Sequence, residues 1–268
     1  MILKVSHFVF SSENFEENGK ILNKLNYHNI FIEKNIKNLT IKKPLFTSFN
    51  DYHDLGYYIS KNSISVELLN WNSKISNNSN FTPLFEEVDE HLLKNKKAIK
   101  LGSLTYYAGK IDNFPGFCFL EDNTKNIKMN CLMVNTEDIK KSIQFWKILG
   151  FEVKKYPEIN HENDDTKFAI LHLKSLLPRT ETFNLYLKET DNINKDPHLD
   201  DKGISCLSFL STDIKKEKEV LLTHNAAVIE VGELIINNKL LNILFAVGPC
   251  GELIEIIDFK SNKNKVNV

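Results

Sequence analysis

The feature of this sequence that most constrains its fold is a repeated order of elements. Four times along the 268 residues, a strand-like run is followed by a helix-like run or its remnant, and then by further strands. Each unit spans about 50 to 70 residues, a period at which repetition determines the architecture. We therefore predict an α+β fold of four βαβββ-type modules, the second degenerate, in paired curved mixed sheets. Each sheet should carry helices on one face and line a cleft with the other.

The first unit shows the pattern clearly. The alternation and spacing of its apolar residues predict a helix over 14–25, begun by a cap at Ser11 or Ser12, and a polar loop over 34–54. Its predicted strands cover 2–10, 27–33, 55–60 and 64–71.

The second unit is the least regular. A polar stretch over 72–80 reads as a linker. We then predict a helix over 86–97 and strands over 104–108 and 117–120, the last after a Pro115-Gly116 turn.

The third and fourth units repeat the order of the first. In the third, Asn135 or Thr136 should cap a helix that Gly150 ends. The predicted helices cover 139–149 and 215–224, and the predicted strands cover 127–134, 151–155, 168–173, 183–187, 204–210, 228–230, 241–247 and 251–257. With a second linker over 191–203, this predicts an N-terminal domain at 1–124, a C-terminal domain at 125–260 and a polar tail at 261–268.

Composition excludes several classes of function. Apolar residues make up 42%, charged residues 26%, and the net charge is −1, so neither nucleic acid nor an acidic membrane is indicated as a partner. Arg179 is the only arginine, which limits bidentate clamps for carboxylates and phosphates.

The amino-acid composition also bears on the cellular location of the protein and on the redox state of its cysteines. No apolar run approaches the roughly 20 residues of a membrane span, and the first residues lead into a strand rather than a signal peptide. We expect a cytoplasmic protein, or an organellar one if a leader has been removed. Four cysteines lie in or beside apolar runs and form no CxxC pair, which indicates buried free thiols in a reducing compartment. They are Cys118, Cys131, Cys206 and Cys250.

Two glutamates lie within otherwise apolar strands. Glu67 alternates with Val66 and Leu68, and Glu255 has the same setting near the end of the chain. A carboxylate in such a strand is costly unless it meets a cation, a metal ion or water. We interpret Glu67 and Glu255 as two arms of one site, with His7 as the third.

Simpler interpretations stay open. His7 could be a hydrogen-bonded core histidine, Glu67 could pair with a lysine, and Glu255 could be solvated, as we expect of Glu252 and Asp258. The remaining histidines show no ligand spacing and are interpreted as surface or incidental residues: His28, His53, His91, His161, His172, His198 and His224.

Three stretches resemble the vicinal oxygen chelate superfamily, and within it the glyoxalase I group. They are Leu3-Lys4-Val5-Ser6-His7-Phe8-Val9-Phe10-Ser11, Val66-Glu67-Leu68-Leu69-Asn70-Trp71 and Gly248-Pro249-Cys250-Gly251-Glu252-Leu253-Ile254-Glu255-Ile256. The layout of all four units, including the run from Ser142 to Phe151, is similar to the glyoxalase domain-containing protein 4 family. This implies the glyoxalase/bleomycin resistance/dioxygenase fold.

The resemblance implies two places for a metal ion. The first, between units one and four, would use His7, Glu67, Ser205 and Glu255. A divalent ion such as Zn, Ni, Co, Mn or Fe is implied there, with Glu255 also acting as the catalytic base. The second would contain Pro83, Leu120, Asn130 and Asn184 or Tyr186. Since proline and leucine offer no side-chain donor, we predict that this second place is structural.

Two departures from the family pattern affect the predicted activity. Ser205 stands where the family has histidine, and Ser11 stands where an arginine grips glutathione, so glutathione is doubtful as co-substrate. We predict a glyoxalase I-like, lactoylglutathione lyase-type metalloenzyme acting on a hemithioacetal or a related small molecule. The alternative is an inactive binding or interaction protein of the same fold. An iron dioxygenase is disfavoured because it needs two histidines. A monomer is favoured, since one chain holds both halves of the site.

Overall fold

The computed structural model describes residues 1–61, 63–72, 79–86, 94–101, 104–110, 117–118, 128–155, 167–177, 182–237 and 239–259. The first unit has strands β1 (Ile2–Ser11), β2 (His28–Lys37), β3 (Tyr52–Ser60) and β4 (Ser63–Asn70), with helix α1 (Phe15–Lys24) and 3-10 helix η1 (Thr40–Leu45). The second has β5 (Phe81–Glu86), β6 (Lys94–Leu101), β7 (Leu104–Lys110) and β8 (Phe117–Cys118).

The third and fourth units each have one helix and four strands. The third has β9 (Lys128–Thr136), α2 (Ile139–Ile148), β10 (Glu152–Lys155), β11 (Phe168–Leu173) and β12 (Phe183–Glu189). The fourth has β13 (Gly203–Ser211), α3 (Ile214–Thr223), β14 (Ala227–Ile236), β15 (Lys239–Val247) and β16 (Leu253–Phe259). The predicted α+β class is therefore confirmed.

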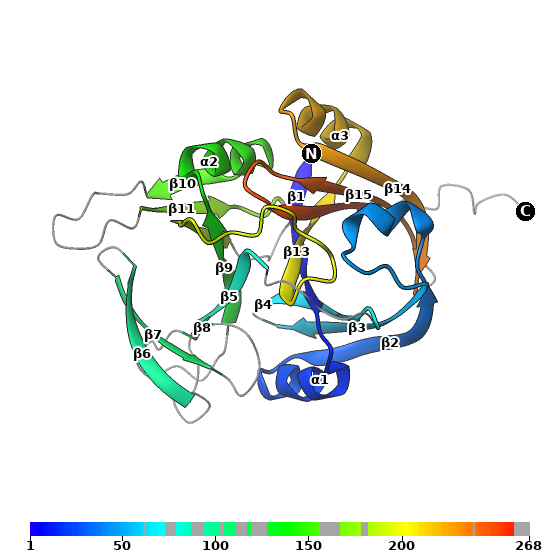
Figure 1. Cartoon of the computed structure of the whole chain (residues 1–268), viewed down its shortest axis with the longest axis horizontal. Coiled ribbons are helices and arrows are strands. Elements are labelled where there is room, and N and C mark those ends of the chain that lie inside the picture. Colours follow the sequence, from blue (N-terminus) through cyan, green and yellow to red (C-terminus); the bar gives the residue numbers. More distant parts are fainter. Residues whose placement is uncertain are drawn as a thin grey trace, which may run out of the picture.

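The units pair in space as first with fourth and second with third (Figure 1). Among the described residues, 14 strands form one sheet, whose main path runs β10-β11-β12-β9-β5-β13-β1-β4-β3-β2. β16 pairs with β13 and β15, β14 pairs with β15, and β8 pairs with β5, while β6 and β7 form a separate pair. The first unit thus lies beside the fourth, because β1 and β13 are antiparallel neighbours.

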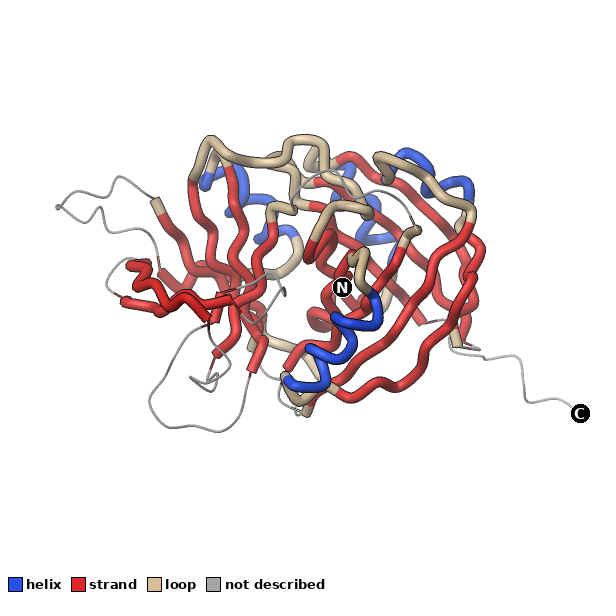
Figure 2. The backbone as a smooth tube through the Cα atoms, turned by 60° about the horizontal axis from the view of Figure 1, so that its bottom comes forward, coloured by secondary structure: helices blue, strands red, loops and turns tan. Residues whose placement is uncertain are grey.

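The two faces of this curved sheet bury different sets of side chains. Helices α1, α2 and α3 lie outside the strands (Figure 2), and their apolar residues, such as Leu22, Ile143 and Leu221, pack in one large core. The inner face of the first and fourth units carries a second cluster, which includes Val9, Trp71 and Leu45 of η1. Each strand contributes side chains to both faces of the sheet, because successive side chains point to opposite sides.

The three α-helices of the described residues end alike, as repeats should. Asn26, Gly150 and Asn225 follow α1, α2 and α3 in the left-handed region, with φ of 62°, 91° and 59°. Asparagine and glycine are the residues that tolerate this conformation best. The prediction that Gly150 ends the third unit's helix is confirmed.

The helices begin within one residue of their predicted starts, but the predicted capping residues of α1 and α2 are wrong by two or three positions. α1 starts after Asn14, whose backbone N–H donates to Ser12 Oγ, and no side chain caps it. α2 is capped by Asp138, whose carboxylate accepts from the backbone N–H groups of Lys140 and Lys141. Aspartate is as good a cap as the residues predicted, and only the backbone path selects among them.

The second unit departs most from prediction. Residues 94–97 belong to β6 rather than to a helix, and 87–93 lie outside the described residues. Hydrogen bonding to β7 outweighs the weak helical preference of a lysine-rich run. β5, which lies between β9 and β13, was not predicted. The loop predicted over 34–54 also contains the end of β2 and η1.

Other predictions stand or lie outside the described residues. Cys131, Cys206 and Cys250 are buried free thiols, as predicted. The proposed domain boundary near residue 124 and the tail at 261–268 fall outside the described residues, so that division stays a prediction.

A buried carboxyl group ties α2 to the turn before β16. Glu252 is fully buried, so its predicted solvation was wrong, whereas Asp258 is half-buried. Ser142 donates to Glu252 Oε1, and the backbone N–H of Cys250 donates to Oε2 at 2.8 Å. Burial raises the pKa of Glu252, an effect that these two donors oppose. Gly251, with φ of 80°, completes the turn that leads into β16.

We predict that Ser142→Ala destabilises the protein by about 1–3 kcal/mol, because it leaves a buried carboxyl group without one of its two donors. Urea denaturation measures the loss. Gln144→Ala on the exposed side of the same helix is the control and should change stability by less than about 0.5 kcal/mol. Equal effects of the two variants would contradict this account.

Candidate metal centre

His7, Glu67 and Glu255 come together on the inner face of the sheet. They lie on β1, β4 and β16, and their ligand atoms are all within 4.8 Å of one another. His7 Nε2 is 3.5 Å from Glu67 Oε2 and 3.4 Å from Glu255 Oε2. The sequence predicted this convergence of the chain's beginning and end. That the three residues bind a metal ion stays a proposal.

The spacing of these atoms suits a bound ion. His7 Nε2 is buried without a hydrogen-bond partner, while Nδ1 contacts Ser6 Oγ at 3.1 Å. Direct charged hydrogen bonds would be about 2.7–2.9 Å long. Ligands about 2.1 Å from one ion stand roughly 3.0–3.4 Å apart in octahedral or tetrahedral geometry. The imidazole therefore faces the carboxylates at nearly the separation that a shared ion imposes.

Without a metal ion, the imidazole serves as the cation for the two carboxylates. Burial alone would lower the pKa of His7, but the carboxylates of Glu255 and Glu67 hold it well above its ordinary value. Burial alone would raise the pKa of Glu255, but His7 and then Lys42 bring it below its ordinary value. The two carboxylates therefore favour a positive charge between them.

Strand register relates the first and fourth units by an approximate two-fold axis. Glu67 on β4 is the neighbour of Val9 on β1, and Glu255 on β16 is the neighbour of Ser208 on β13. Both pairs are parallel. Val9 and Ser208 are therefore equivalent positions.

The same axis makes Cys206 the counterpart of His7, since each lies two residues before its unit's equivalent position. Between β1 and β13, Val9 faces Cys206 and His7 faces Ser208, as this symmetry requires. The predicted position, Ser205, is wrong by one residue, because it is the extra residue of a bulge. Cys206 carries a buried free thiol, whose pKa is raised well above its ordinary value by burial and then by Glu255 and Glu67.

The second and third units show the same symmetry without the same chemistry. Tyr186 neighbours Met133, and Phe117 neighbours Leu84, in parallel pairs. Across the antiparallel pair β5 and β9, Cys131 faces Leu84 and Met133 faces Thr82.

The four equivalent positions here are thus Thr82, Cys131, Tyr186 and Phe117. Leu84, Cys131 and Met133 form an apolar cluster with Tyr186 packed against it. Tyr186 was one predicted alternative, Pro83 and Asn130 are each one residue away, and Leu120 lies outside the described residues.

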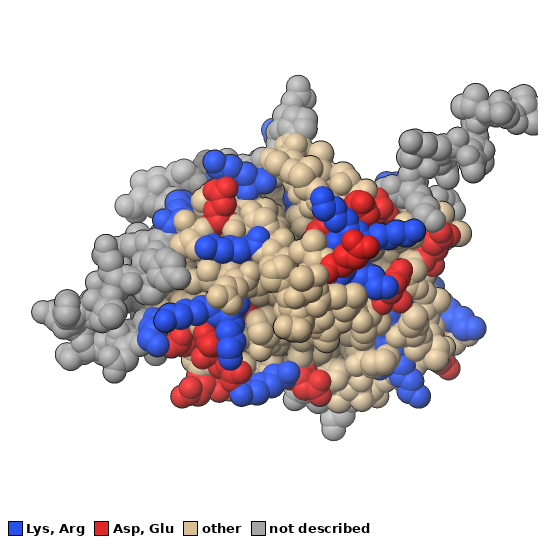
Figure 3. Space-filling view, turned by 90° about the horizontal axis from the view of Figure 1, so that it is seen from above, with Lys and Arg blue, Asp and Glu red and all other residues tan. Residues whose placement is uncertain are grey.

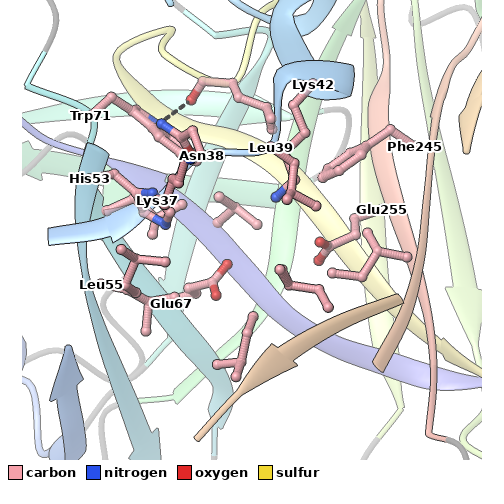
Figure 4. A pocket seen from close by; sticks show the side chains of 17 residues that line it. Lys37, Asn38, Leu39, Lys42, His53, Leu55, Glu67, Trp71, Phe245 and Glu255 are labelled. Carbon is pink, nitrogen blue, oxygen red and sulfur yellow. Dashed lines mark hydrogen bonds between the residues drawn. The ribbon is translucent and has the colours of Figure 1, made fainter. Parts of the chain in front are cut away.

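A pocket leads from the paired glutamates toward η1 and encloses about 540 Å³, including space open to solvent. In Figure 4, Glu67 and Glu255 face one another across it, and Lys42 extends from η1 on another side. Burial lowers the pKa of Lys42, and Glu255 and Glu67 oppose this shift. Sequence reasoning missed Lys42, since nothing in a polar loop signals a buried lysine.

His53 also lines this pocket and is buried, so its interpretation as incidental was wrong. Burial, with a contribution from Lys42, lowers the pKa of His53 to about 4, which leaves its imidazole neutral at pH 7. Ser11 is buried at the end of β1 and does not line the pocket, and Arg179 lies outside the described residues.

The surface gives no sign of a polyanionic partner on the face shown in Figure 3, where basic and acidic side chains are interspersed. No helix in the described part of the chain is long and apolar enough to cross a membrane.

In the presence of a chelator, stability should fall as pH rises through the folded-state pKa of His7. A raised pKa contributes stability that is complete below about 6.5 and is lost above it, at up to about 1.4 kcal/mol per pH unit. Urea denaturation between pH 6 and 9 measures this slope. His7→Gln should flatten it, and the control His28→Gln, at an exposed position, should leave it unchanged. An unchanged slope in His7→Gln would rule out His7 as its source.

Comparison with known proteins places the fold. No protein-family model matches the chain, and no curated protein matches it. Glyoxalase I from Zea mays matches with a TM-score of 0.64 at 13% identity, over 95% of this chain and 92% of that one. A putative dioxygenase from Bacillus subtilis matches with a TM-score of 0.61 at 10% identity, over 97% and 86%. The resemblance to the glyoxalase domain-containing protein 4 family stays a prediction. The chain therefore has a fold similar to that of glyoxalase I.

Proposed function

We propose that this protein is a glyoxalase I-like metalloprotein that uses one divalent ion, held by His7, Glu67 and Glu255, on a small oxygenated substrate. The observation that carries the proposal is the buried Nε2 of His7, which makes no hydrogen bond and faces two carboxylates at 3.4 and 3.5 Å. A lyase or isomerase acting on a hemithioacetal or a related molecule is the reaction class favoured. One chain supplies all three groups, which supports action as a monomer.

The residues divide the chemistry between them. A bound divalent ion would polarise the oxygens of a substrate and stabilise negative charge that develops there. Glu255 lines the pocket and is kept ionised by its cationic neighbours, so it can accept a proton from a substrate carbon and return it. His7 and Glu67 hold the ion.

Cys206 adds a preference among metals. Two carboxylates and an imidazole suit many divalent ions, but a thiolate selects softer ones. If Cys206 turns toward the ion, Zn, Co and Ni are favoured over Mn. Its position as the counterpart of His7 supports this role.

We expect about one divalent ion per chain, measured by elemental analysis and by titration of the chelator-treated protein with Zn²⁺ or Co²⁺. His7→Ala should weaken binding by on the order of 100-fold or more, since a directly bound ligand is lost. The matched control His28→Ala should bind normally. In the Co²⁺ titration, Cys206→Ser should remove a thiolate-to-cobalt charge-transfer band. Absence of stoichiometric metal in the wild type would overturn the proposal.

Turnover tests the role of Glu255. With hemithioacetals of methylglyoxal, formed with glutathione and with small thiols, Glu255→Gln should reduce kcat by about 10²–10⁴-fold, because the proton acceptor is lost. Metal content measured in the same sample separates loss of the base from loss of the ion. Unchanged turnover in this variant would exclude Glu255 as the base.

The alternative is a binding protein without catalysis. It is favoured by the fact that His7 and Lys42 already place positive charge beside the two buried glutamates. This alternative predicts neither stoichiometric metal nor turnover.

A further inference from the structure

The upper part of the pocket, between the glutamates and η1, contains polar groups that the proposed metal centre does not use. Asn38 Oδ1 and His53 Nδ1 are buried and have no hydrogen-bond partner. Lys42 is 7% exposed, and no carboxylate of the described residues lies within ion-pair distance of its ammonium group. Its ammonium is instead 5.5 Å from the centre of the Phe245 ring. A cation–π contact of this kind only partly replaces lost water.

The fold holds Lys42 in this position. Leu199 donates its backbone N–H to Leu45 O at 2.8 Å, at the end of η1. The carboxylate of Asp200 accepts from the backbone N–H groups of Thr47 and Ser48 at 2.9 and 3.0 Å. Because these three hydrogen bonds would have to break to release η1, the burial of Lys42 is built into the structure.

The loop that clamps η1 is itself anchored to the pocket wall. Trp71 Nε1 donates to Leu199 O at 2.8 Å, and the Trp71 ring packs against Phe46, just after η1. Lys42 therefore extends from a helix, η1, that hydrogen bonds and packing hold in place.

Charge defines what the pocket can accept. His7, or an ion in its place, pairs with Glu67 and Glu255, and neither glutamate lies within ion-pair distance of Lys42. With or without the ion, Lys42 is therefore a cation without a direct partner in a poorly solvated space. His53 cannot balance it, because the imidazole is neutral at pH 7. A buried charge needs a partner of opposite sign.

Shape and polarity restrict the partner further. Most of the lining is aliphatic, with Leu55, Leu69, Leu234, Ile236 and Ile243 among the wall residues. Lys37 is exposed and also borders the pocket. A large polar dianion would leave its second charge against aliphatic walls, whereas a compact monoanion would not.

We propose that this pocket binds a small organic monoanion with an apolar body, and that the ammonium group of Lys42 pairs with its carboxylate or enolate oxygen. This proposal specifies the substrate class of the site and rests on the proposed function for that reason. The pairing with Lys42 can nevertheless be tested without any metal ion. Lys42 would thus determine specificity for charge.

The test uses hexanoate and its neutral isostere hexanamide as probes, titrated into the full-length protein by isothermal calorimetry. Measurements with a chelator and with Zn²⁺ separate the two proposals, because direct binding of carboxylate to the ion requires Zn²⁺. In the chelator-treated wild type, hexanoate should bind at least about tenfold more tightly than hexanamide, as expected for one added charge pair.

Lys42→Met, which keeps the length of the side chain and removes its charge, should abolish that preference. Lys43→Met, at the exposed neighbouring position, should keep it. If Lys42→Met does not fold, Lys42→Gln serves as the second neutral variant. Equal binding of both probes by the wild type, no binding of either, or a preference that survives in the neutral variants would overturn the role of Lys42. Loss of metal binding alone would overturn only the proposed function.

Discussion

The pairing of β1 with β13 is the interaction on which the rest of this structure depends. It joins the first unit to the fourth, so that strands about 200 residues apart in the chain become neighbours. β4 then pairs with β1, and β16 with β13, which places Glu67 and Glu255 on either side of His7. Neither half of the chain contains the candidate centre alone. The candidate centre therefore depends on this long-range strand pairing more than on the secondary structure within any one unit.

Burial of two carboxylates on the inner face dictates the chemistry of the pocket. Such groups need positive charge nearby, and the chain provides two built-in sources, His7 and Lys42. The His7 imidazole can release its proton to solvent when a divalent ion binds, whereas the ammonium group of Lys42 keeps its charge. A bound metal ion can therefore replace the positive charge of His7. The charge of Lys42 remains and favours the binding of an anion in the adjoining part of the pocket. The same electrostatic requirement links the proposed metal ion to the proposed ligand.

Most elements were predictable, because apolar periodicity reports local structure directly. The failures share a physical cause. In three of the four units the predicted counterpart of His7 is one residue away, at Ser205, Asn130 and Pro83. Since strand side chains alternate, a one-residue error moves a position to the other face of the sheet. A bulge at Ser205 produced one of these errors, and bulges leave no mark in apolar periodicity.

The fold class, the repeated order of elements, and the candidate triad of His7, Glu67 and Glu255 could all be predicted from the order of the residues. These follow from periodicity and from the cost of placing ionisable groups in apolar strands, both of which are local properties. Tertiary structure alone decided that Cys206 is the counterpart of His7, that β6 is a strand, and that Lys42 is buried above the glutamates. Each depends on the register or packing of distant segments, because which neighbour a residue meets is set by the pairing of strands and not by the residues beside it in the chain.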